Sequence, residues 1–472
     1  MAQPETLEDE PWDASDGRDP GEPVPGLVLI FSGDRPTFAP IPLERGSIEL
    51  GRGEVSGVRI DDERMSRAHA RVAYDGRRWS VRDLGSRNGT AVDGEKLSDE
   101  CAGEALRVVR TGSSLFLLAP DLRPLRAGVD VAGGMVMGPA LERAFKAVTR
   151  AARMGRIVHV TGESGAGKEL LARAFHDGGP ARRGPFIAVN GATLPENIAE
   201  RLLFGARKGA YSGAVDAKGF VQSAHGGTLF LDEVAELDLA VQAKLLRVIE
   251  TSEVMPLGAN APERVDIRIC SATHADLRAR VAEGKMRADL FFRLGTPTVA
   301  LPPLRERLEE IPWLVERAVR EAGGARGGAV ASALAPHTSL VEACLLRRWP
   351  GNVREILSEV RQAAQIAADE GSVVLGRHLA PRAGMAMEPL QAEGSSSSSS
   401  SPSPPAPERP SDEVIREALR AAGGNVSRAA RALGMHRTQL NRWRARQKDN
   451  DAADTADATD ATDAEDAEDA DD

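Results

Sequence analysis

The sequence predicts a multidomain protein with an all-β sandwich first, an α/β domain in the middle and an all-α domain near the end. In residues 27–118, short apolar segments alternate with Gly, Asp and Asn turns, which is typical of a β-sandwich. In residues 131–381, apolar strands alternate with helical stretches, which indicates a parallel sheet. Residues 411–447 have a helical pattern interrupted by glycines. The 472 residues exceed one ordinary core, so several folded units are expected.

The segments beyond these domains have compositions that do not support a core. Residues 1–25 are acidic and interrupted by Pro and Gly, and residues 449–472 repeat Asp, Ala and Thr, so both are expected to be disordered tails. Residues 385–410 contain a Ser run followed by Pro-rich sequence, which is typical of a flexible to extended linker.

The net charge of −10 conceals segments of opposite sign. Residues 449–472 hold twelve acidic residues and no basic one, and the rest of the chain is nearly neutral. Residues 425–448 hold seven Arg or Lys and no acidic residue, which suits contact with phosphate backbones. DNA is therefore a candidate partner despite the acidic balance.

Cysteine content and apolar runs bear on the cellular compartment. The three cysteines have no paired spacing, so neither a disulfide framework nor a zinc site is indicated, which fits a reducing cytosol. The acidic N-terminal segment lacks the features of a signal peptide, and no apolar run approaches membrane-spanning length. We expect a soluble, cytoplasmic protein with no membrane partner.

Three loops of the predicted sandwich carry groups that suit phosphate recognition. They lie at residues 51–52, 66–69 and 83–90, and together they resemble a forkhead-associated (FHA) domain, which would span residues 26–120. The resemblance assigns phosphothreonine binding to Arg52, Ser66, Arg67, Arg87 and Asn88. His69 is expected to organise the loops without touching the ligand. Ordinary β-turns with surface arginines are the alternative.

An FHA domain implies that the input is Ser/Thr phosphorylation. The expected partner is a phosphothreonine protein, either a Ser/Thr kinase or its substrate.

A phosphate-binding loop follows the apolar strand at residues 157–160 and precedes a helical stretch. It matches the Gly-x-x-x-x-Gly-Lys pattern, in which backbone amides and the Lys hold nucleotide phosphates. The residues assigned to nucleotide binding here are Gly162, Glu163, Ser164, Gly165, Ala166, Gly167, Lys168 and Glu169. Glu169 stands where a general P-loop has Ser or Thr, so Mg²⁺ is expected to depend more on Asp232.

Asp232 and Glu233 end a second apolar strand that begins at Thr228. One carboxylate can hold Mg²⁺ while its neighbour polarises the attacking water. By itself such a pair is as often a solvated turn, but after a P-loop it indicates ATP hydrolysis.

Four motifs together resemble the AAA+ domain of bacterial enhancer-binding proteins. They lie at residues 162–169, 227–233, 303–307 and 349–354. The resemblance implies an α/β AAA+ ATPase with a helical lid over residues 131–384, with ATP and Mg²⁺ as cofactors. It implies that Lys168 binds phosphate, that Asp232 binds magnesium and that Glu233 activates water.

The same resemblance assigns roles to four further residues. Asn190 would be a switch that holds Glu233 away from water until the target is engaged, and Arg354 would be a sensor near the nucleotide. Arg287 and Arg293 would be arginine fingers of a neighbouring subunit, which offset charge on the γ-phosphoryl group. Activity would therefore need a homo-oligomeric ring, expected to be a hexamer. From the residues alone, Asn190 would be a turn cap and the arginines surface ion-pair residues.

The loop at residues 209–214 interrupts the ATPase core and is not needed for nucleotide binding. In the family it typically has the sequence Gly-Ala-Phe-Thr-Gly-Ala and contacts the sigma-54 factor of RNA polymerase, so that ATP hydrolysis remodels the closed promoter complex. The contact is assigned to Gly209, Ala210, Tyr211, Ser212, Gly213 and Ala214. Tyr211 and Ser212 replace the family's Phe and Thr, and His274 stands where the family usually has Asn as a first sensor.

Residues 424–446 resemble a helix-turn-helix (HTH) of the Fis type, in an all-α domain over residues 411–448. Its packing is assigned to Ala429, Ala430, Leu433, Leu440 and Trp443, around Gly434. Contacts with DNA are assigned to Arg437, Thr438, Gln439, Asn441 and Arg442. A basic solvated helix is the alternative.

The sequence thus predicts an ATP-dependent transcription activator that binds enhancer DNA, remodels sigma-54 RNA polymerase and responds to phosphothreonine. One alternative is a sigma-54-independent regulator in which the nucleotide acts only as a switch. A second is an ATP-driven remodeller of another protein.

Overall fold

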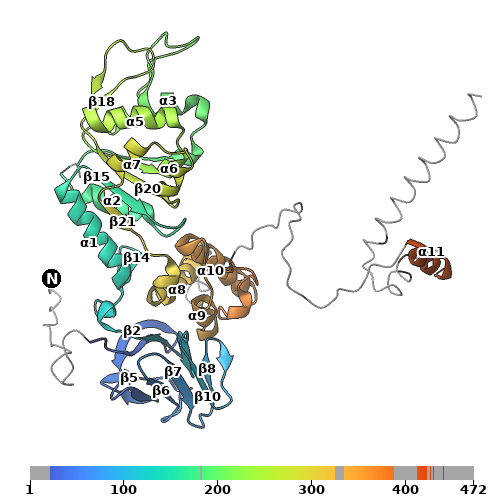
Figure 1. The fold of residues 1–472 in the computed structure, drawn as a ribbon. Coiled ribbons are helices and arrows are strands. Elements are labelled where there is room, and N and C mark those ends of the chain that lie inside the picture. Colours follow the sequence, from blue (N-terminus) through green and yellow to red (C-terminus); the bar gives the residue numbers. More distant parts are fainter. Residues whose placement is uncertain are drawn as a thin grey trace, which may run out of the picture. The chain divides into compact units, whose positions relative to one another are not determined.

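The computed structural model describes residues 22–180, 183–324, 334–386 and 412–422, together with Val426, Ala429 and Leu440. The chain divides into two compact units, Met1–Pro389 and Leu390–Asp472, and Figure 1 shows the order of their elements. In the described part of the chain, no helix is both long and apolar enough to cross a bilayer.

The larger unit begins with a sandwich of two antiparallel sheets. One sheet has the strand order β2 (Arg35–Pro42), β1 (Gly26–Ser32), β12 (Ser114–Ala119), β11 (Val108–Thr111), β8 (Thr90–Val92) and β9 (Glu95–Lys96). The other has the order β10 (Glu100–Gly103), β7 (Trp79–Asp83), β6 (Ala70–Tyr74) and β3 (Ser47–Leu50), while β4 (Gly53–Val55) pairs with β5 (Val58–Ile60). Leu27, Leu29, Trp79 and Phe116 are buried between the sheets, so the predicted all-β sandwich is confirmed.

A parallel sheet forms the centre of the α/β domain. Its strand order is β16 (Phe186–Asn190), β17 (Thr228–Asp232), β20 (Arg268–Thr273), β15 (Ile157–Thr161) and β21 (Thr298–Ala300). In β17, Leu229 and Leu231 belong to one core and Phe230 to another, because successive side chains of a strand point to opposite faces. Both faces are covered, which explains the uninterrupted apolar sequence of this strand.

Helices cover both faces of this sheet. The helices of the α/β domain are α1 (Pro139–Met154), α2 (Lys168–Asp177), α3 (Glu196–Phe204), α4 (Phe220–Ser223), α5 (Leu239–Thr251), α6 (Leu277–Ala282) and α7 (Ala288–Leu294). Two short hairpins complete the domain, β13 (Asp130–Ala132) with β14 (Met135–Met137) and β18 (Glu253–Val254) with β19 (Glu263–Arg264). The predicted α/β class is confirmed.

The helical lid consists of α8 (Ile311–Gly324), α9 (Thr338–Leu345) and α10 (Asn352–Asp369). Its core is continuous with the outer face of the first sandwich sheet, since Val28 and Leu117 are buried in the same cluster as Leu314 and Leu340. This contact was not predicted from the sequence. It explains why β1 is apolar at successive positions, because one face of the strand packs inside the sandwich and the other against the lid.

The second unit contains helix α11 (Asp412–Ala421). Ile415 of this helix is buried together with Ala429 and Leu440, which lie further along the chain. Ala429 and Leu440 are two of the residues expected to pack the HTH. The DNA-contact residues Arg437, Thr438, Gln439, Asn441 and Arg442 lie outside the described residues. So do residues 1–21, 387–410 and 449–472, which contain most of the predicted tails and linker.

Candidate nucleotide site and phosphopeptide surface

The P-loop joins the end of β15 to the start of α2, at the carboxyl edge of the parallel sheet. Gly165 and Gly167 have φ angles of 72° and 112°, in the left-handed region that glycine adopts readily. A Cβ atom on Gly165 would lie 2.2 Å from the main-chain oxygen of Gly351 in the lid. Glycine at position 165 therefore allows both the loop conformation and the close approach of the lid.

A cavity of about 650 Å³ lies at this loop, within the usual size range of small-molecule sites. It brings together most of the residues predicted from the nucleotide motifs, namely Ser164, Gly165, Ala166, Gly167, Lys168, Glu169, Asn190, Asp232, Glu233 and Arg354. Gly162 lies at its edge, where its main-chain oxygen accepts a hydrogen bond of 3.0 Å from Nζ of Lys168. Arg354 reaches the loop from the lid, with Nη1 3.4 Å from Oγ of Ser164. An apolar side of the cavity suits a nucleotide base, and it is formed by Val136 of the hairpin, Leu141 of α1 and the lid residues Leu314 and Leu357.

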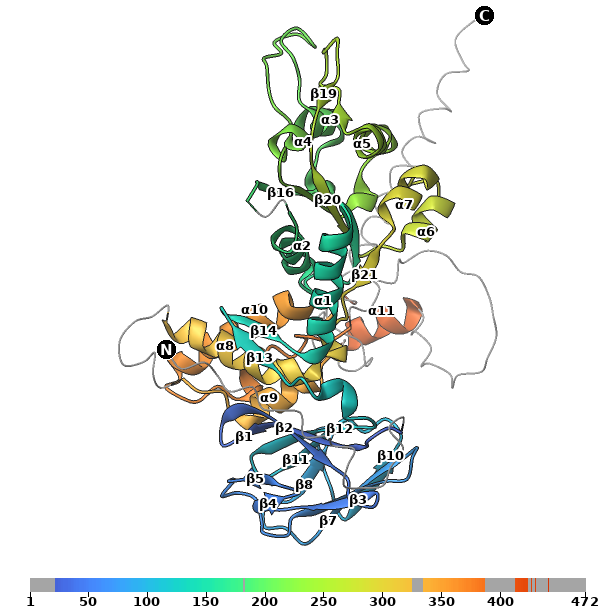
Figure 2. The same ribbon diagram turned by 90° about the vertical axis from the view of Figure 1, so that its left-hand side faces the viewer.

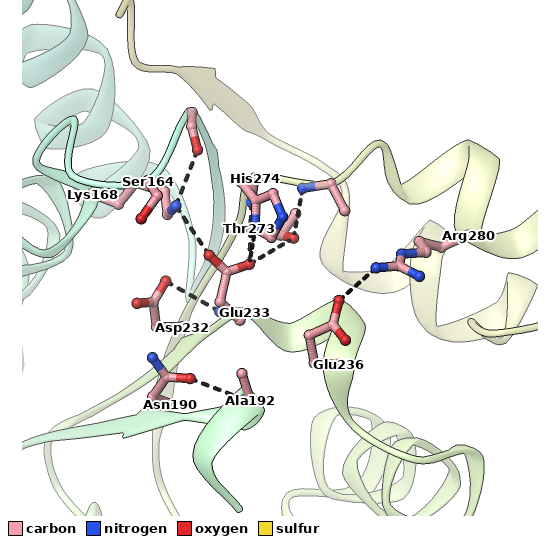
Figure 3. A network of polar contacts seen from close by, with 12 residues as sticks. Ser164, Lys168, Asn190, Ala192, Asp232, Glu233, Glu236, Thr273, His274 and Arg280 are labelled. Carbon is pink, nitrogen blue, oxygen red and sulfur yellow. Dashed lines mark hydrogen bonds and ion pairs between the residues drawn. The ribbon is translucent and has the colours of Figure 1, made fainter. Parts of the chain in front are cut away.

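The two acidic residues at the end of β17 have different environments (Figure 3). Burial raises the pKa of Asp232, although the charge of Lys168 opposes this effect. Burial also raises the pKa of Glu233, but hydrogen bonds from His274 and the charge of Lys168 outweigh it and lower the pKa below its usual value. Glu233 is therefore held as a carboxylate, only 13% exposed and 3.3 Å from Nζ of Lys168.

The side chains at this site fit an ATP–Mg²⁺ complex. No group of three or more potential metal ligands occurs among the residues that the structure describes. Mg²⁺ at nucleotide sites usually needs only one or two carboxylates, because phosphate oxygens and waters complete its shell. Asp232 can supply such a ligand, while Lys168 and the P-loop amides would hold the phosphates.

Asn190 ends β16 beside Asp232, as Figure 3 shows. Its Oδ1 atom accepts a hydrogen bond of 2.9 Å from the main-chain nitrogen of Ala192. Asn190 thus caps the following turn, as expected from the residue alone. Its role as a switch toward Glu233 stays a prediction.

Arg287 and Arg293 lie at the start and near the end of α7, and both are exposed. Arg287 forms an ion pair of 2.7 Å with Asp289. Neither arginine is among the described residues that line the cavity. This placement fits a role toward another subunit and not toward the nucleotide of the same chain.

Sequence reasoning missed Asn352, a fully buried residue of the lid. Its Nδ2 atom donates to Oε2 of Glu163 at 3.1 Å and to the main-chain oxygen of Ser164 at 3.0 Å. Its Oδ1 atom accepts from the main-chain nitrogen of Leu304 at 2.7 Å. Asn352 therefore ties the P-loop to the lid, and its place in the motif at 349–354 was the available signal.

The motif at 303–307 supplies two arginines that also contact the P-loop. Arg305 pairs with Glu163 at 2.7 Å. Arg307 is buried and donates to the main-chain oxygen of Ala166 at 3.2 Å and to Glu310 at 3.0 Å. Their partners in the P-loop, Glu163 and Ala166, are more than a hundred positions away in the chain, so the motif alone did not reveal these contacts.

The loop at 209–214 lies between α3 and α4. Two main-chain hydrogen bonds of 2.9 Å between Ala206 and Ala217 close its base. Arg207 then donates to the main-chain oxygen of Leu257, which lies in the loop between β18 and β19. Figure 2 shows the two loops extending together at the end of the domain near β19.

The tip of this loop presents its polar residues to solvent. Tyr211, Ser212 and Gly213 are exposed, whereas Ala214 is buried. The hydroxyl of Tyr211 accepts a hydrogen bond of 3.1 Å from Nη1 of Arg201 in α3. A phenylalanine at position 211 could not make this contact, so the departure from the family sequence adds an anchor to the loop.

The three loops predicted to bind phosphothreonine contact one another. The main-chain nitrogen of Arg52 donates to the main-chain oxygen of Ser66 at 2.9 Å, and that of Arg87 donates to Oγ of Ser66 at 3.1 Å. Nδ2 of Asn88 donates to the main-chain oxygen of Arg64 at 2.5 Å. Arg52, Arg67, Arg87 and Asn88 are exposed, so cationic and amide groups gather on these connected loops.

His69 and Asp83 organise these loops from beneath. His69 is buried, and its Nδ1 atom accepts a hydrogen bond of 3.0 Å from the main-chain nitrogen of Ser66. Its Nε2 atom lies 3.2 Å from the main-chain oxygen of Gly89. These contacts are those expected of a residue that organises the loops. Burial raises the pKa of Asp83, but hydrogen bonds from Thr90, Ser86 and Gly85 outweigh it and lower the pKa to about 2.

Three family models match parts of this chain. The family model "Sigma-54 interaction domain" matches residues 135–300, "FHA domain" matches residues 48–107, and "Bacterial regulatory protein, Fis family" matches residues 411–445.

Two curated proteins illustrate the similarity. The DNA-binding transcriptional regulator NtrC of Azospirillum brasilense is 39% identical over 327 residues, which cover 64% of this chain and 67% of NtrC. The Nif-specific regulatory protein of Azotobacter vinelandii is 39% identical over 311 residues, which cover 65% of this chain and 57% of that protein. A crystal structure of NtrX from Brucella abortus in complex with ATP matches with a TM-score of 0.49 and 31% identity, covering 66% of this chain and 68% of NtrX.

Proposed function

Because this chain belongs to the sigma-54-dependent transcriptional regulators of the NtrC type and carries their AAA+ ATPase domain, we propose that it couples ATP hydrolysis to remodelling of the sigma-54 RNA polymerase closed complex. The observation that carries this proposal is the loop 209–214, whose residues 211–213 are exposed and which extends from the same domain that holds the nucleotide cavity. The proposal assigns the contact with sigma-54 to this loop.

Within the nucleotide cavity, each residue has a proposed task. Lys168 and the P-loop amides bind the phosphates, Asp232 holds Mg²⁺ and Glu233 accepts the proton of the attacking water. The bound nucleotide supplies the phosphoanhydride bond whose cleavage drives the cycle. Arg354 reports the state of the site to the lid, because it reaches Ser164 from α10.

We also assign Arg287 and Arg293 to the active site of the next subunit. Their exposure on α7, beside the exposed aromatic ring of Phe292, favours an interface between subunits. A homo-oligomeric ring, expected to be a hexamer, would then be the active form. A guanidinium group inserted across such an interface accelerates phosphoryl transfer by electrostatic stabilisation.

Phosphothreonine recognition is the proposed input. Arg52, Ser66, Arg67, Arg87 and Asn88 belong to connected loops of the FHA domain. Three guanidinium groups on such a surface suit a phosphate with two negative charges. The Fis-type segment is the proposed anchor on enhancer DNA, and the protein would act in the cytoplasm together with the polymerase.

Reconstituted transcription tests the central proposal. Open complexes should form with polymerase that contains sigma-54, only with hydrolysable ATP, and not with polymerase that contains a main-type sigma factor. Lys168→Ala should abolish them, whereas Lys146→Ala, on the exposed face of α1, serves as a matched control. Normal ATP hydrolysis without open complexes would instead support the regulator in which the nucleotide acts only as a switch.

A phosphopeptide titration tests the input. Arg52→Ala should lose affinity for a phosphothreonine peptide, and the unphosphorylated peptide should bind neither protein. Arg59→Ala, an exposed arginine of β5 that pairs with Asp61, is the control for loss of surface charge. Equal affinity of the wild type and Arg52→Ala for the phosphopeptide would contradict the assignment.

A further inference from the structure

A group of exposed arginines on the FHA loops has no counter-ion among the described residues. Its members lie in the loops after β3, before β6 and after β7, and they are Arg52, Arg64, Arg67 and Arg87. These four arginines form the basic loop surface. Four other arginines of the same sandwich each pair with a carboxylate, namely Arg59, Arg71, Arg77 and Arg82. The basic loop surface therefore keeps positive charge available for a ligand.

Two acidic residues of these loops are engaged by other groups. Asp83 accepts from Oγ1 of Thr90 at 2.6 Å and from Oγ of Ser86 at 2.7 Å. Asp62 is buried and accepts from the main-chain nitrogen of Ser113 at 2.7 Å. Neither carboxylate pairs with the basic loop surface, so an anionic partner must come from elsewhere in the chain or from another molecule.

The first residues of the chain, which lie outside the described part, have the opposite charge. Residues 1–13 contain five acidic residues and no Lys or Arg, and Thr6 is the one threonine of residues 1–25. Phosphorylation of Thr6 would add about −1.5 to −2 charge and three acceptor oxygens. Guanidinium groups bind phosphate through paired, charge-assisted hydrogen bonds, whereas exposed carboxylates contribute little. Phosphate would therefore turn a weak ligand into a strong one.

The end of β1 lies at the same edge of the sandwich as the basic loop surface. The hydroxyl of Ser32, the last residue of β1, is 2.9 Å from that of Ser114. Oγ of Ser114 in turn donates to Asp62 at 2.9 Å, and Asp62 begins the loop that carries Arg64 and Arg67. The start of β1 is therefore one strand length away from this edge.

The chain that precedes β1 is long enough to cover this distance. Val24 is fixed to the sandwich, since its main-chain nitrogen donates to Asp121 at 3.1 Å and its main-chain oxygen accepts from Leu122. From Val24 to Ser32 the chain covers about 26 Å, at 3.3 Å per residue. From Thr6 to Val24 it can span up to about 60 Å. Thr6 can therefore reach the basic loop surface of its own FHA domain.

We propose that phosphothreonine at position 6 binds to the basic loop surface of the same chain, so that Thr6 is a modification site whose product occupies the FHA domain. This inference deepens the proposed function, because it rests on phosphothreonine recognition by these loops and names the ligand. A Ser/Thr protein kinase would supply the phosphate from ATP. Oγ1 of Thr6 forms a bond to the γ-phosphorus, ADP leaves with the electron pair of the broken phosphoanhydride bond, and the hydroxyl proton passes to a base of the kinase.

Tethering favours this segment over a separate phosphoprotein. A short linker gives an effective concentration of about 1 mM, so a free peptide with a Kd of about 10 μM would bind about 100-fold more weakly once the site is occupied. The acidic segment at the other end of the chain is less favourably placed. Its first threonine, Thr455, stands 69 residues beyond Ala386, the last described residue of the larger unit. On length alone, its effective concentration is about sevenfold lower.

Peptide binding identifies the ligand. The probe is a fluorescent peptide of residues 1–13 with phosphothreonine at position 6, titrated with full-length Thr6→Val, which cannot carry the phosphate. This probe should bind at least about 10-fold more tightly than the unphosphorylated peptide. Arg52→Ala in the same background should remove the difference. Arg59→Ala, which removes an arginine that pairs with Asp61, should keep it.

Binding within one chain is tested on full-length protein with phosphothreonine inserted at position 6 during synthesis. Its affinity for the free probe should be about 10- to 100-fold lower than that of the unmodified protein, and dilution of the protein should not restore it. Phosphoserine at position 15 adds the same charge to the same segment and should change the affinity less than about threefold. Mass spectrometry of the protein from its own cells should find phosphate on Thr6.

Four results would each overturn the inference: unchanged affinity of the phosphorylated protein for the probe, recovery on dilution, which indicates binding to a second copy, an equal block by phosphoserine at position 15, and no phosphate on Thr6 in cells. A second phosphothreonine peptide, without acidic residues, separates failure of the inference from failure of the proposed function. If only this second peptide binds, and Arg52→Ala abolishes its binding, the inference alone fails. If neither peptide binds, phosphothreonine recognition by the FHA domain is refuted as well.

Discussion

Nε of Arg110 in β11 donates a hydrogen bond of 2.8 Å to Oε2 of Glu342 in α9, so one ion pair joins the FHA sandwich to the lid of the ATPase. A second bond lies beside it, from Oγ1 of Thr338 to the main-chain oxygen of Ser113 at 2.9 Å. The neighbouring Asp62 accepts from the main-chain nitrogen of Ser113 at 2.7 Å and begins the loop that carries Ser66. The lid and the proposed phosphopeptide surface are therefore joined through short, specific contacts.

Arg110→Ala should destabilise the protein by about 1–3 kcal/mol, because it leaves Glu342, whose side chain is 11% exposed, without its counter-ion. Adding Glu342→Gln should recover part of this loss, since it removes the uncompensated charge. Denaturant unfolding measures both effects. Arg71→Ala breaks an exposed cross-strand pair with Glu49 in the same sandwich and should cost less than about 0.5 kcal/mol. An equal effect of the two arginine variants would contradict the interface.

The stability of the FHA sandwich should fall as the pH drops below about 6.5, the usual pKa of histidine. Burial lowers the pKa of His69 in the folded state, although its bond to Gly89 and the charges of Asp83 and Asp62 oppose this effect. The unfolded chain therefore binds the proton first, and protonation at Nδ1 would remove the acceptor of the Ser66 amide. The contribution of one such proton is at most about 1.4 kcal/mol per pH unit.

Thermal unfolding between pH 5 and 7.5 measures this effect, with His69→Asn as the comparison because it does not titrate. The wild type should lose stability more steeply on acidification than the variant. Parallel pH profiles would show that His69 does not contribute.

Arg307→Met should destabilise the protein by roughly 3–5 kcal/mol, because the side chains of Arg307 and Glu310 are each only 1% exposed and the variant leaves one buried charge unpaired. It should also weaken nucleotide binding, since Arg307 supports the P-loop at Ala166. Chemical denaturation and titration with a fluorescent ATP analogue measure the two effects. Arg320→Met, in an exposed pair with Glu316, should be nearly neutral. Similar unfolding curves for the two variants would refute the prediction.

Tyr211→Phe should leave the stability of the protein within about 0.5 kcal/mol of the wild type, because the lost bond to Arg201 is exposed. It should also retain sigma-54-dependent open-complex formation, since the aromatic ring remains. Tyr211→Ala should abolish it while ATP hydrolysis continues. Val215→Ala, an exposed residue just after the loop, is the matched control. Full activity of Tyr211→Ala would show that this side chain does not act on the polymerase.

The P-loop could be predicted because its features are local. The glycine spacing sets the main-chain conformation of Gly165 and Gly167, and the adjoining apolar strand and helix were visible in the sequence. The lid residues behind it could not be assigned in this way. Asn352 lies almost two hundred positions from the loop that it holds, and the contact exists only because α10 packs there.

For the acidic residues of the site, the sequence predicted the position in the chain but not the tertiary contacts. Asp232 and Glu233 were placed at the end of a strand by the apolar sequence before them, and the structure puts them there. The contact of Glu233 with His274 depends on β20 lying beside β17. The sequences of these two strands do not determine that they are neighbours in the sheet. The contact of Asn190 could be predicted from the sequence, because it is a local turn cap of the kind that asparagine favours.

By itself, the sequence determined the kinds of domain, their order and the local chemistry of the P-loop, the strand ends and the sandwich loops. These properties follow from spacing and side-chain type over a few residues, where main-chain geometry and alternation act directly. Only the tertiary structure decided that the lid packs on the outer face of the sandwich, and that His274 meets Glu233. Both contacts join residues far apart in the chain, and they depend on which apolar faces bury each other and on how the strands are ordered.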